Sequence, residues 1–140
     1  MAPPPRFIVH SLAHAEAALR AARERGVPII LESPRDAARF WGAPYFLALI
    51  AQAHAAVPEA RFEAVLDCGT APGLAMEALR RGVRIVRLRD SNEMMARVAD
   101  MAHRVGARLE PGPCPDGAHD LDQSRDPGEA ARRFLVEGRP

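Results

Sequence analysis

The spacing of apolar residues along the chain switches between two patterns, and the switching predicts strands followed by helices. Short apolar runs typical of buried strands alternate with longer stretches in which apolar residues recur every three or four positions. The expected strands are residues 6–10, 27–31, 62–67, 83–89 and 107–110, and the expected helices are 12–25, 34–57 with a break at 42, 74–81, 92–105 and 129–136. Ser11, Ser33 and Ser91 are the expected helix N-caps.

Strands joined by helices predict an α/β fold, a parallel sheet of four or five strands with right-handed helical crossovers. The pattern leaves two arrangements open. One is an arc of a (β/α)8 barrel, and the other is an open flavodoxin-like sheet with the first strand inside it. From Pro111 the composition turns to Pro, Gly and Asp, which predicts a loop or partly disordered segment as far as Gly128. The expected division is an α/β domain over 1–111 and a tail with a short helix over 112–140.

Composition narrows the functional classes. The 140 residues carry 19 basic and 18 acidic side chains, so a net charge of +1 gives no reason to expect a nucleic-acid partner. Every basic residue is Arg, and without Lys a Schiff-base lysine mechanism is excluded. No apolar run is long enough to span a membrane, and residues 1–5 lack the apolar core of a secretory signal. We therefore expect a cytoplasmic protein with reduced thiols.

Asp67 and Cys68 end the third expected strand, and the rest of the pattern is arranged around that stretch. In α/β folds the carboxyl ends of parallel strands deliver side chains to the functional cleft. Asp67 is thus a candidate proton carrier, and Cys68 is a candidate metal ligand or nucleophile. The competing interpretation is structural, with Asp67 capping the following turn and Cys68 acting as a small buried hydrophobe.

A second set of polar candidates lies at the ends of other strands. Arg89 ends the fourth strand, where it could bind a phosphate or carboxylate, or instead form a salt bridge to Asp67 or Asp90. Asp90 and Ser91 follow it, and Ser11 follows the first strand in the same way. We count Ser11, Arg89, Asp90 and Ser91 as candidate ligand-binding residues.

Several short motifs resemble the N-terminal half of the class II, metal-dependent fructose-bisphosphate and ketose-bisphosphate aldolases. The segment 66–70, Leu-Asp-Cys-Gly-Thr, is similar to the family's Leu-Asp-His-Gly-Ser. Residues 30–42 resemble its second strand and the Ser/Ala/Gly segment after it, and the likeness extends over about residues 7 to 112. The resemblance implies a truncated (β/α)8 barrel and zinc-assisted lyase chemistry, with Asp67 in the place of the catalytic acid/base and Cys68 in that of the first histidine ligand.

The departures from the family pattern imply a degenerate metal site. Arg89-Asp90-Ser91 stands where the family has Asp-Gly-Ser, so the acid is displaced by one position. Gly112 falls about where the family has a glutamate ligand. As a thiolate, Cys68 would also weaken the Lewis acidity of a zinc ion.

Three functions remain open from the sequence. The first is an aldolase-like half-barrel that lacks the full site and serves as a binding or interaction module. The second is a zinc-dependent lyase completed by self-association, and the third is a domain that binds a phosphorylated small molecule. We also expect a homo-oligomer, because half a barrel leaves the first strand and the fifth strand as open edges.

Overall fold

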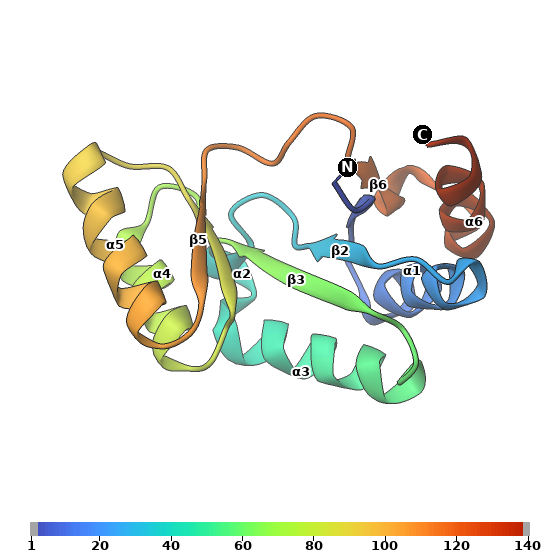
Figure 1. Ribbon diagram of the computed structural model, residues 1–140, viewed down its shortest axis with the longest axis horizontal. Coiled ribbons are helices and arrows are strands. Elements are labelled where there is room, and N and C mark those ends of the chain that lie inside the picture. The colour runs from blue at the N-terminus through green and yellow to red at the C-terminus, as the bar shows by residue number, and fades with distance from the viewer. Residues whose placement is uncertain (1–2, 139–140) are drawn as a thin grey trace. The chain divides into compact units, whose positions relative to one another are not determined.

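The computed structural model describes residues 3–138, which divide into two compact units. Among the described residues, unit 1 comprises 3–32, 48–63 and 115–138, and unit 2 comprises 33–47 and 64–114. Two elements, α3 (Gly42–Ala56) and β3 (Phe62–Asp67), run from one unit into the other along the chain. Each unit is described below by itself, with the elements labelled as in Figure 1.

The strands are parallel and hydrogen-bond in the linear order β5-β4-β3-β2-β1-β6, which is an open sheet. Strands consecutive in sequence are therefore neighbours from β1 to β5, as in an arc of a barrel. The first strand pairs with the second and not with the third. The predicted α/β fold with helical crossovers is confirmed, but the sheet of the described residues has six strands and not four or five, because β6 adds to β1. β1 lies inside the open sheet, as in the flavodoxin-like alternative, but the strand order is not that alternative's because β1 does not pair with β3.

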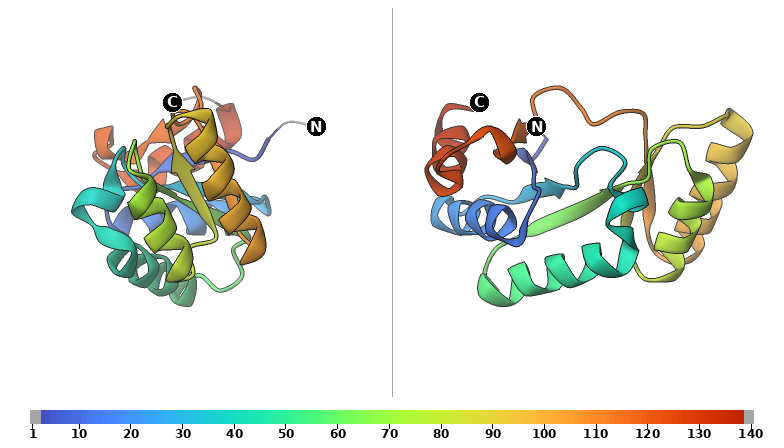
Figure 2. Two further views of the ribbon diagram at one scale, coloured as in Figure 1. Left: turned by 90° about the vertical axis from the view of Figure 1, so that its left-hand side faces the viewer. Right: turned by 180° about the vertical axis from the view of Figure 1, so that it is seen from behind.

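Unit 1 is built around β1 (Arg6–Ile8), β2 (Ile29–Glu32) and β6 (His119–Asp120). β1 lies between the other two, with Phe7 opposite Leu31 on one side and His119 on the other. The helices α1 (Leu12–Arg25) and α6 (Pro127–Glu137) pack on each other, as Figures 1 and 2 show. Phe7 and Leu19 are fully buried in this core.

The segment 112–128 is more ordered than we expected from its composition. It contains β6 and the 3-10 helix η1 (Leu121–Gln123), whose Leu121 is fully buried. Residues 112–118 and 124–126 are irregular, as expected, but residues 119–123 are ordered because pairing with β1 and burial of Leu121 compensate for their low propensity. The expectation that β1 is an open edge is wrong, since β6 occupies that edge.

Unit 2 holds β4 (Ile85–Leu88) and β5 (Arg108–Pro111) beside β3, with α4 (Pro72–Arg80) and α5 (Asn92–Arg104) packed together next to them. All four residues of β4 are buried, including Arg87, which is 1% exposed. The arginine is tolerated because its guanidinium is paired, as described below.

The helix that we expected to begin at Ser33-Pro34 begins later. α2 (Ala37–Phe40) has Asp36 as its N-cap, so the prediction of Ser33 as an N-cap is wrong. The Ser33 hydroxyl instead accepts the backbone N–H of Asp67 at 2.9 Å and donates to the Pro34 carbonyl at 3.1 Å. Ser11 and Ser91 cap α1 and α5 as predicted.

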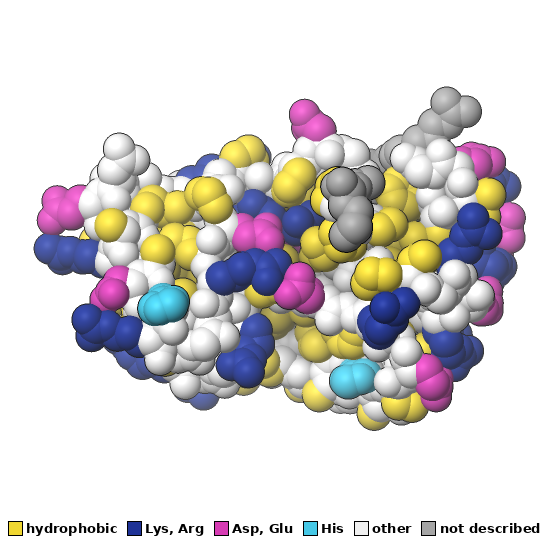
Figure 3. All heavy atoms as spheres, viewed as in Figure 1, with side chains coloured by type: hydrophobic (Ala, Val, Ile, Leu, Met, Phe, Trp, Pro, Cys, Tyr) yellow, Lys and Arg dark blue, Asp and Glu magenta, His cyan; other side chains and the backbone are white. Residues whose placement is uncertain are grey.

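Charged side chains of both signs are interspersed over the face in Figure 3, in keeping with the net charge of +1. Pairs of opposite charge four positions apart on a helix include Glu16 with Arg20 and Glu93 with Arg97. Such exposed pairs contribute little to stability. Within residues 3–138, no helix has the length and apolar character needed to cross a bilayer.

Candidate functional site

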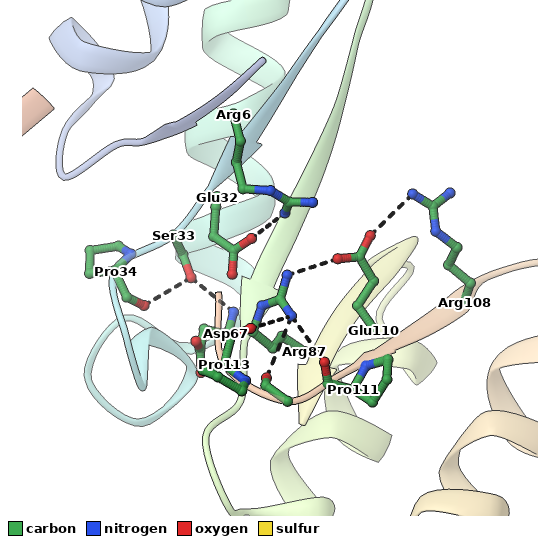
Figure 4. A network of polar contacts seen from close by, with 11 residues as sticks. Arg6, Glu32, Ser33, Pro34, Asp67, Arg87, Arg108, Glu110, Pro111 and Pro113 are labelled. Carbon is green, nitrogen blue, oxygen red and sulfur yellow. Dashed lines mark hydrogen bonds and ion pairs between the residues drawn. The ribbon is translucent and has the colours of Figure 1, made fainter. Parts of the chain in front are cut away.

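Asp67 lies at the end of β3, 2% exposed, and its carboxylate is held by backbone groups. Oδ1 accepts the N–H of Gly69 at 2.8 Å and the N–H of Asp36 at 3.3 Å. The backbone N–H of Asp67 donates in turn to Ser33 Oγ, and Figure 4 shows Ser33 directed at Asp67 from the neighbouring loop. One buried carboxylate thus fastens the loop after β2 to the loop after β3.

Gly69 is required at this point by both conformation and space. Its φ of 58° is left-handed, and a Cβ built there would overlap Oδ1 of Asp36 and lie 3.0 Å from Cγ of the same side chain. Asp36 is itself left-handed, with φ of 60°, which is uncommon for a residue with a side chain. The two loops are therefore closely fitted, and Asp67 forms the hydrogen bonds that hold them.

Cys68 is fully buried, and its Sγ lies 3.7 Å from the Leu66 carbonyl oxygen, to which it donates a weak hydrogen bond. Burial, together with a smaller effect of the neighbouring Asp67 charge, raises the pKa of the Cys68 thiol to about 12. The thiolate is the form that attacks electrophiles and binds metals, so Cys68 in this setting is an unreactive thiol.

Arg89 follows β4 and has an unsatisfied side-chain atom. Its backbone N–H donates to the Gly69 carbonyl at 2.8 Å, which places it beside the loop that Asp67 holds. Its Nη1 is buried and has no hydrogen-bond partner among residues 3–138. A buried guanidinium N–H without an acceptor is costly, so this atom marks a place where an anionic ligand would gain binding energy.

The remaining predicted ligand-binding residues serve as local caps. Ser91 Oγ accepts the N–H of Met94 at 3.3 Å, and Asp90 Oδ1 accepts the N–H of Ser91 at 2.6 Å. Ser11 Oγ accepts the N–H of His14 at 3.1 Å in unit 1. Arg89, Asp90 and Ser91 are therefore consecutive in one loop of unit 2, whereas Ser11 belongs to unit 1.

Arg87 is fully occupied by structural contacts. Its Nη2 donates to Glu110 Oε2 at 2.8 Å, and its Nη1 donates to the carbonyls of Pro111 and Pro113 at 3.3 and 3.2 Å. Figure 4 shows the guanidinium directed toward these groups. Arg87 thus fixes the end of β5 and the turn after it, which explains how a central strand accepts an arginine.

A second polar cluster, in unit 1, was not identified from the sequence. His10 Nε2 donates to Asp120 Oδ1 at 2.8 Å, and the backbone N–H of His10 donates to His14 Nδ1 at 3.0 Å. Asp120 also accepts the N–H of Asp122 at 3.0 Å. The only sequence signal was an Asp in a segment that we expected to be a loop, and the partners are separated by more than a hundred positions.

Zinc was implied by the family resemblance, and the donor set here does not fit it. Cys68 is a buried thiol with a raised pKa, and the Oδ1 of Asp67 already accepts two backbone N–H groups. Over residues 3–138, no three His, Cys, Asp or Glu side chains are grouped so that they could share a metal ion. Structural and catalytic zinc sites need at least three protein ligands. We therefore derive no chemical step through a metal.

Comparison with known proteins gives one relationship and one negative result. The chain is 29% identical over 120 residues to a fructose-bisphosphate aldolase from Xanthobacter flavus, and the match covers 76% of this chain. It covers 34% of the aldolase, so the chain spans about a third of the length of this curated relative. No family model matches the chain. The similarity supports an aldolase-related relationship.

Proposed function

We propose that this chain is an aldolase-related binding module whose own residues do not complete a metal-dependent aldolase site. The observation that supports this most directly is the environment of Asp67. A proton carrier needs a carboxylate that can face a substrate, whereas Oδ1 of Asp67 accepts two backbone N–H groups and the residue is 2% exposed. The adjacent thiol is buried and protonated. Both residues expected to carry the chemistry therefore support the fold.

The test is an aldol-cleavage assay on fructose 1,6-bisphosphate, with and without added zinc. We expect no cleavage above the rate of a protein-free control under either condition. The matched variant is Asp67→Asn, which keeps an oxygen acceptor for both backbone N–H groups but cannot act as a base. Zinc-dependent cleavage that disappears in Asp67→Asn would refute the proposal and favour the lyase alternative, completed by self-association.

A phosphorylated small molecule is our candidate ligand, favoured by the unpartnered Nη1 of Arg89. A phosphate oxygen can accept from a guanidinium by a charge-assisted hydrogen bond, stronger than a neutral one. The loop also carries Asp90, whose charge disfavours an anion, so we expect weak binding. Calorimetric titration with fructose 1,6-bisphosphate and with inorganic phosphate should show binding that Arg89→Gln abolishes.

The control for that titration is Arg97→Gln. Arg97 is an exposed arginine of α5 that pairs with Glu93 of the same helix. It should bind as the unmodified chain does. Equal binding by Arg89→Gln and Arg97→Gln would mean that general positive charge, and not Arg89, attracts the anion.

We still propose that the chain forms a homo-oligomer, but through one edge of the sheet only. We expected β1 and β5 to be open edges of the sheet. β6 pairs with the outer edge of β1, whereas β5 remains at an end of the strand order. An unpaired parallel edge favours association unless it is protected. Light scattering at low micromolar concentration should give a mass above that of the single chain. A strictly monomeric mass would contradict association through β5.

A further inference from the structure

The segment 119–138 of unit 1 docks on β1 and α1, and its contacts involve two of the five histidines in the chain, His10 and His119. We call it the docked segment. It contains β6, η1 and α6, and its backbone pairs with β1 over only two positions, Phe7 with His119 and Ile8 with Asp120. So short a ladder cannot hold the segment alone. The side chains around it must supply the remainder of the docking energy.

His119 lies in an aromatic slot. Its ring stacks on Phe134 of α6, with centroids 5.2 Å apart and planes at 16°, and meets Phe7 of β1 edge-on at 6.2 Å. Its Nε2 is buried and has no hydrogen-bond partner among the described residues. A neutral imidazole suits this slot, whereas a protonated one would place a buried N–H⁺ where nothing accepts it.

His14 of α1 is held in its neutral form by a hydrogen bond. Its Nδ1 accepts the backbone N–H of His10, which requires that Nδ1 carry no proton. The ring of His10 lies 5.9 Å from that of His14, and His10 itself is paired with Asp120 on the docked segment. Protonation of His14 at Nδ1 would break the first bond and place a positive charge beside His10.

We propose that the docked segment is a proton-operated latch, which is closed while His119 is neutral and released from β1 when His119 takes up a proton. Release would leave the outer edge of β1 unpaired and free to pair with a strand of a second copy of the chain. The latch does not depend on the aldolase-related function proposed above, because none of its residues belongs to the Asp67 loops.

The sign of the pH dependence follows from the surroundings of each ring. Burial lowers the pKa of His119 below its ordinary value of 6.5, against a smaller raising effect of Asp120. Burial also lowers the pKa of His14, helped by His10 and opposed by Asp122 and Asp120. A base with a depressed folded-state pKa stabilises docking fully above its released-state pKa. That contribution is lost as the pH falls from about 6.5 through the docked pKa values.

One contact acts in the opposite direction. A protonated His10 would strengthen its pair with Asp120, at 2.8 Å, and so hold the segment more firmly in acid. That pair is partly exposed, with 29% of the His10 side chain and 35% of the Asp120 side chain accessible, so solvent screens it. The buried Nε2 of His119 has no acceptor among the described residues, so its protonation costs more than the screened pair gains, and the net effect of acid is release.

Hydrogen exchange of the full chain between pH 7.5 and 5.0, followed by mass spectrometry, tests the latch. Peptides from the docked segment should exchange faster at low pH after correction for intrinsic rates, while peptides from α4 and α5 serve as the internal reference. The opening constant should rise by up to about tenfold per pH unit as His119 takes up its proton, starting at about pH 6.5. An opening constant that does not change with pH would overturn the proposal.

His119→Phe is the decisive variant, because a phenyl ring keeps the stack on Phe134 but cannot take up a proton. It should lose most of the pH dependence and remain docked at pH 5, whereas His103→Gln, which removes an exposed histidine of α5, should behave as the unmodified chain does. Unchanged pH dependence in His119→Phe would also overturn the latch. Should that variant fold poorly, NMR titration of the His119 ring in the unmodified chain decides the question. A His119 pKa at or above 6.5 would contradict it.

Discussion

Asp67 in unit 2 and Asp120 in unit 1 begin from the same local structure and end with different properties. Each lies at the end of a parallel strand, and each accepts the backbone N–H of the residue two positions later, at 2.8 Å from Gly69 and at 3.0 Å from Asp122. This is the turn that aspartate favours after a strand. The other partner differs, because Oδ1 of Asp67 accepts a second backbone N–H and Oδ1 of Asp120 accepts the ring N–H of His10.

The comparison shows that the hydrogen-bond partners of a carboxylate determine its role in the fold. Backbone N–H groups cannot titrate, so Asp67 is a fixed anchor between two loops, and its 2% exposure keeps solvent away. Asp120 instead pairs with the side chain of His10, and this pair is partly exposed to solvent, so it does not hold a buried loop in place. The residue that matches an aldolase motif is therefore a buried anchor, whereas the residue in the tail forms a partly exposed contact with a distant part of the chain.

Asp67→Ala should give the largest loss of stability. It leaves two backbone donors without an acceptor in a buried loop, which at about 1–3 kcal/mol for each orphaned group predicts a loss of about 3 kcal/mol. Urea unfolding followed by circular dichroism measures it. A loss below about 1 kcal/mol would mean that water reaches these donors and that Asp67 is not the anchor.

Gly69→Ala should rank next, at about 2 kcal/mol. The left-handed φ of 58° costs a residue with a Cβ about 1 kcal/mol or more, and Asp36 must also move from the position that the methyl group would occupy. The same unfolding experiment applies, with Gly73→Ala as the control because nothing lies within 4 Å of a Cβ there. Equal stability of the two variants would show that the loops adapt freely.

Asp120→Ala should have the smallest effect, about 1 kcal/mol at neutral pH, since the side chain is partly exposed and its partners can turn to water. Its loss should concentrate in the docked segment, and hydrogen exchange can localise it there. The comparison of the two aspartates would fail if Asp120→Ala destabilised the whole chain as much as Asp67→Ala does.

The sequence predicted the regular elements better than the loops. α1 begins after Ser11 and spans 12–25 as predicted, with Gly26 at its C-terminal end, because a cap, an amphipathic face and a stop all agree over fourteen residues. β6 escaped prediction because two residues, His119 and Asp120, carry no periodicity and form a strand only when β1 is beside them. Ser33 was misassigned because its hydroxyl binds the backbone of Asp67, a partner distant in sequence.

The candidate site was predictable only as a location. The apolar run before Asp67 and Cys68 predicted that these two residues end a central strand, and the structure places them there. What their side chains contact depended on the left-handed turn at Asp36 and on burial of the thiol, which no short motif encodes. The resemblance to a metal-binding motif therefore could not tell a ligand from a buried anchor.

A zinc titration of the unmodified chain, followed by calorimetry at low micromolar protein, tests most directly the claim that this chain does not complete a metal site with its own residues. The account predicts no stoichiometric binding, and curves for Cys68→Ser and Asp67→Asn that match the curve for the unmodified chain. One zinc per chain, bound with release of protons and lost in Cys68→Ser, would contradict it, because a buried thiol with a pKa of about 12 would then have become a ligand.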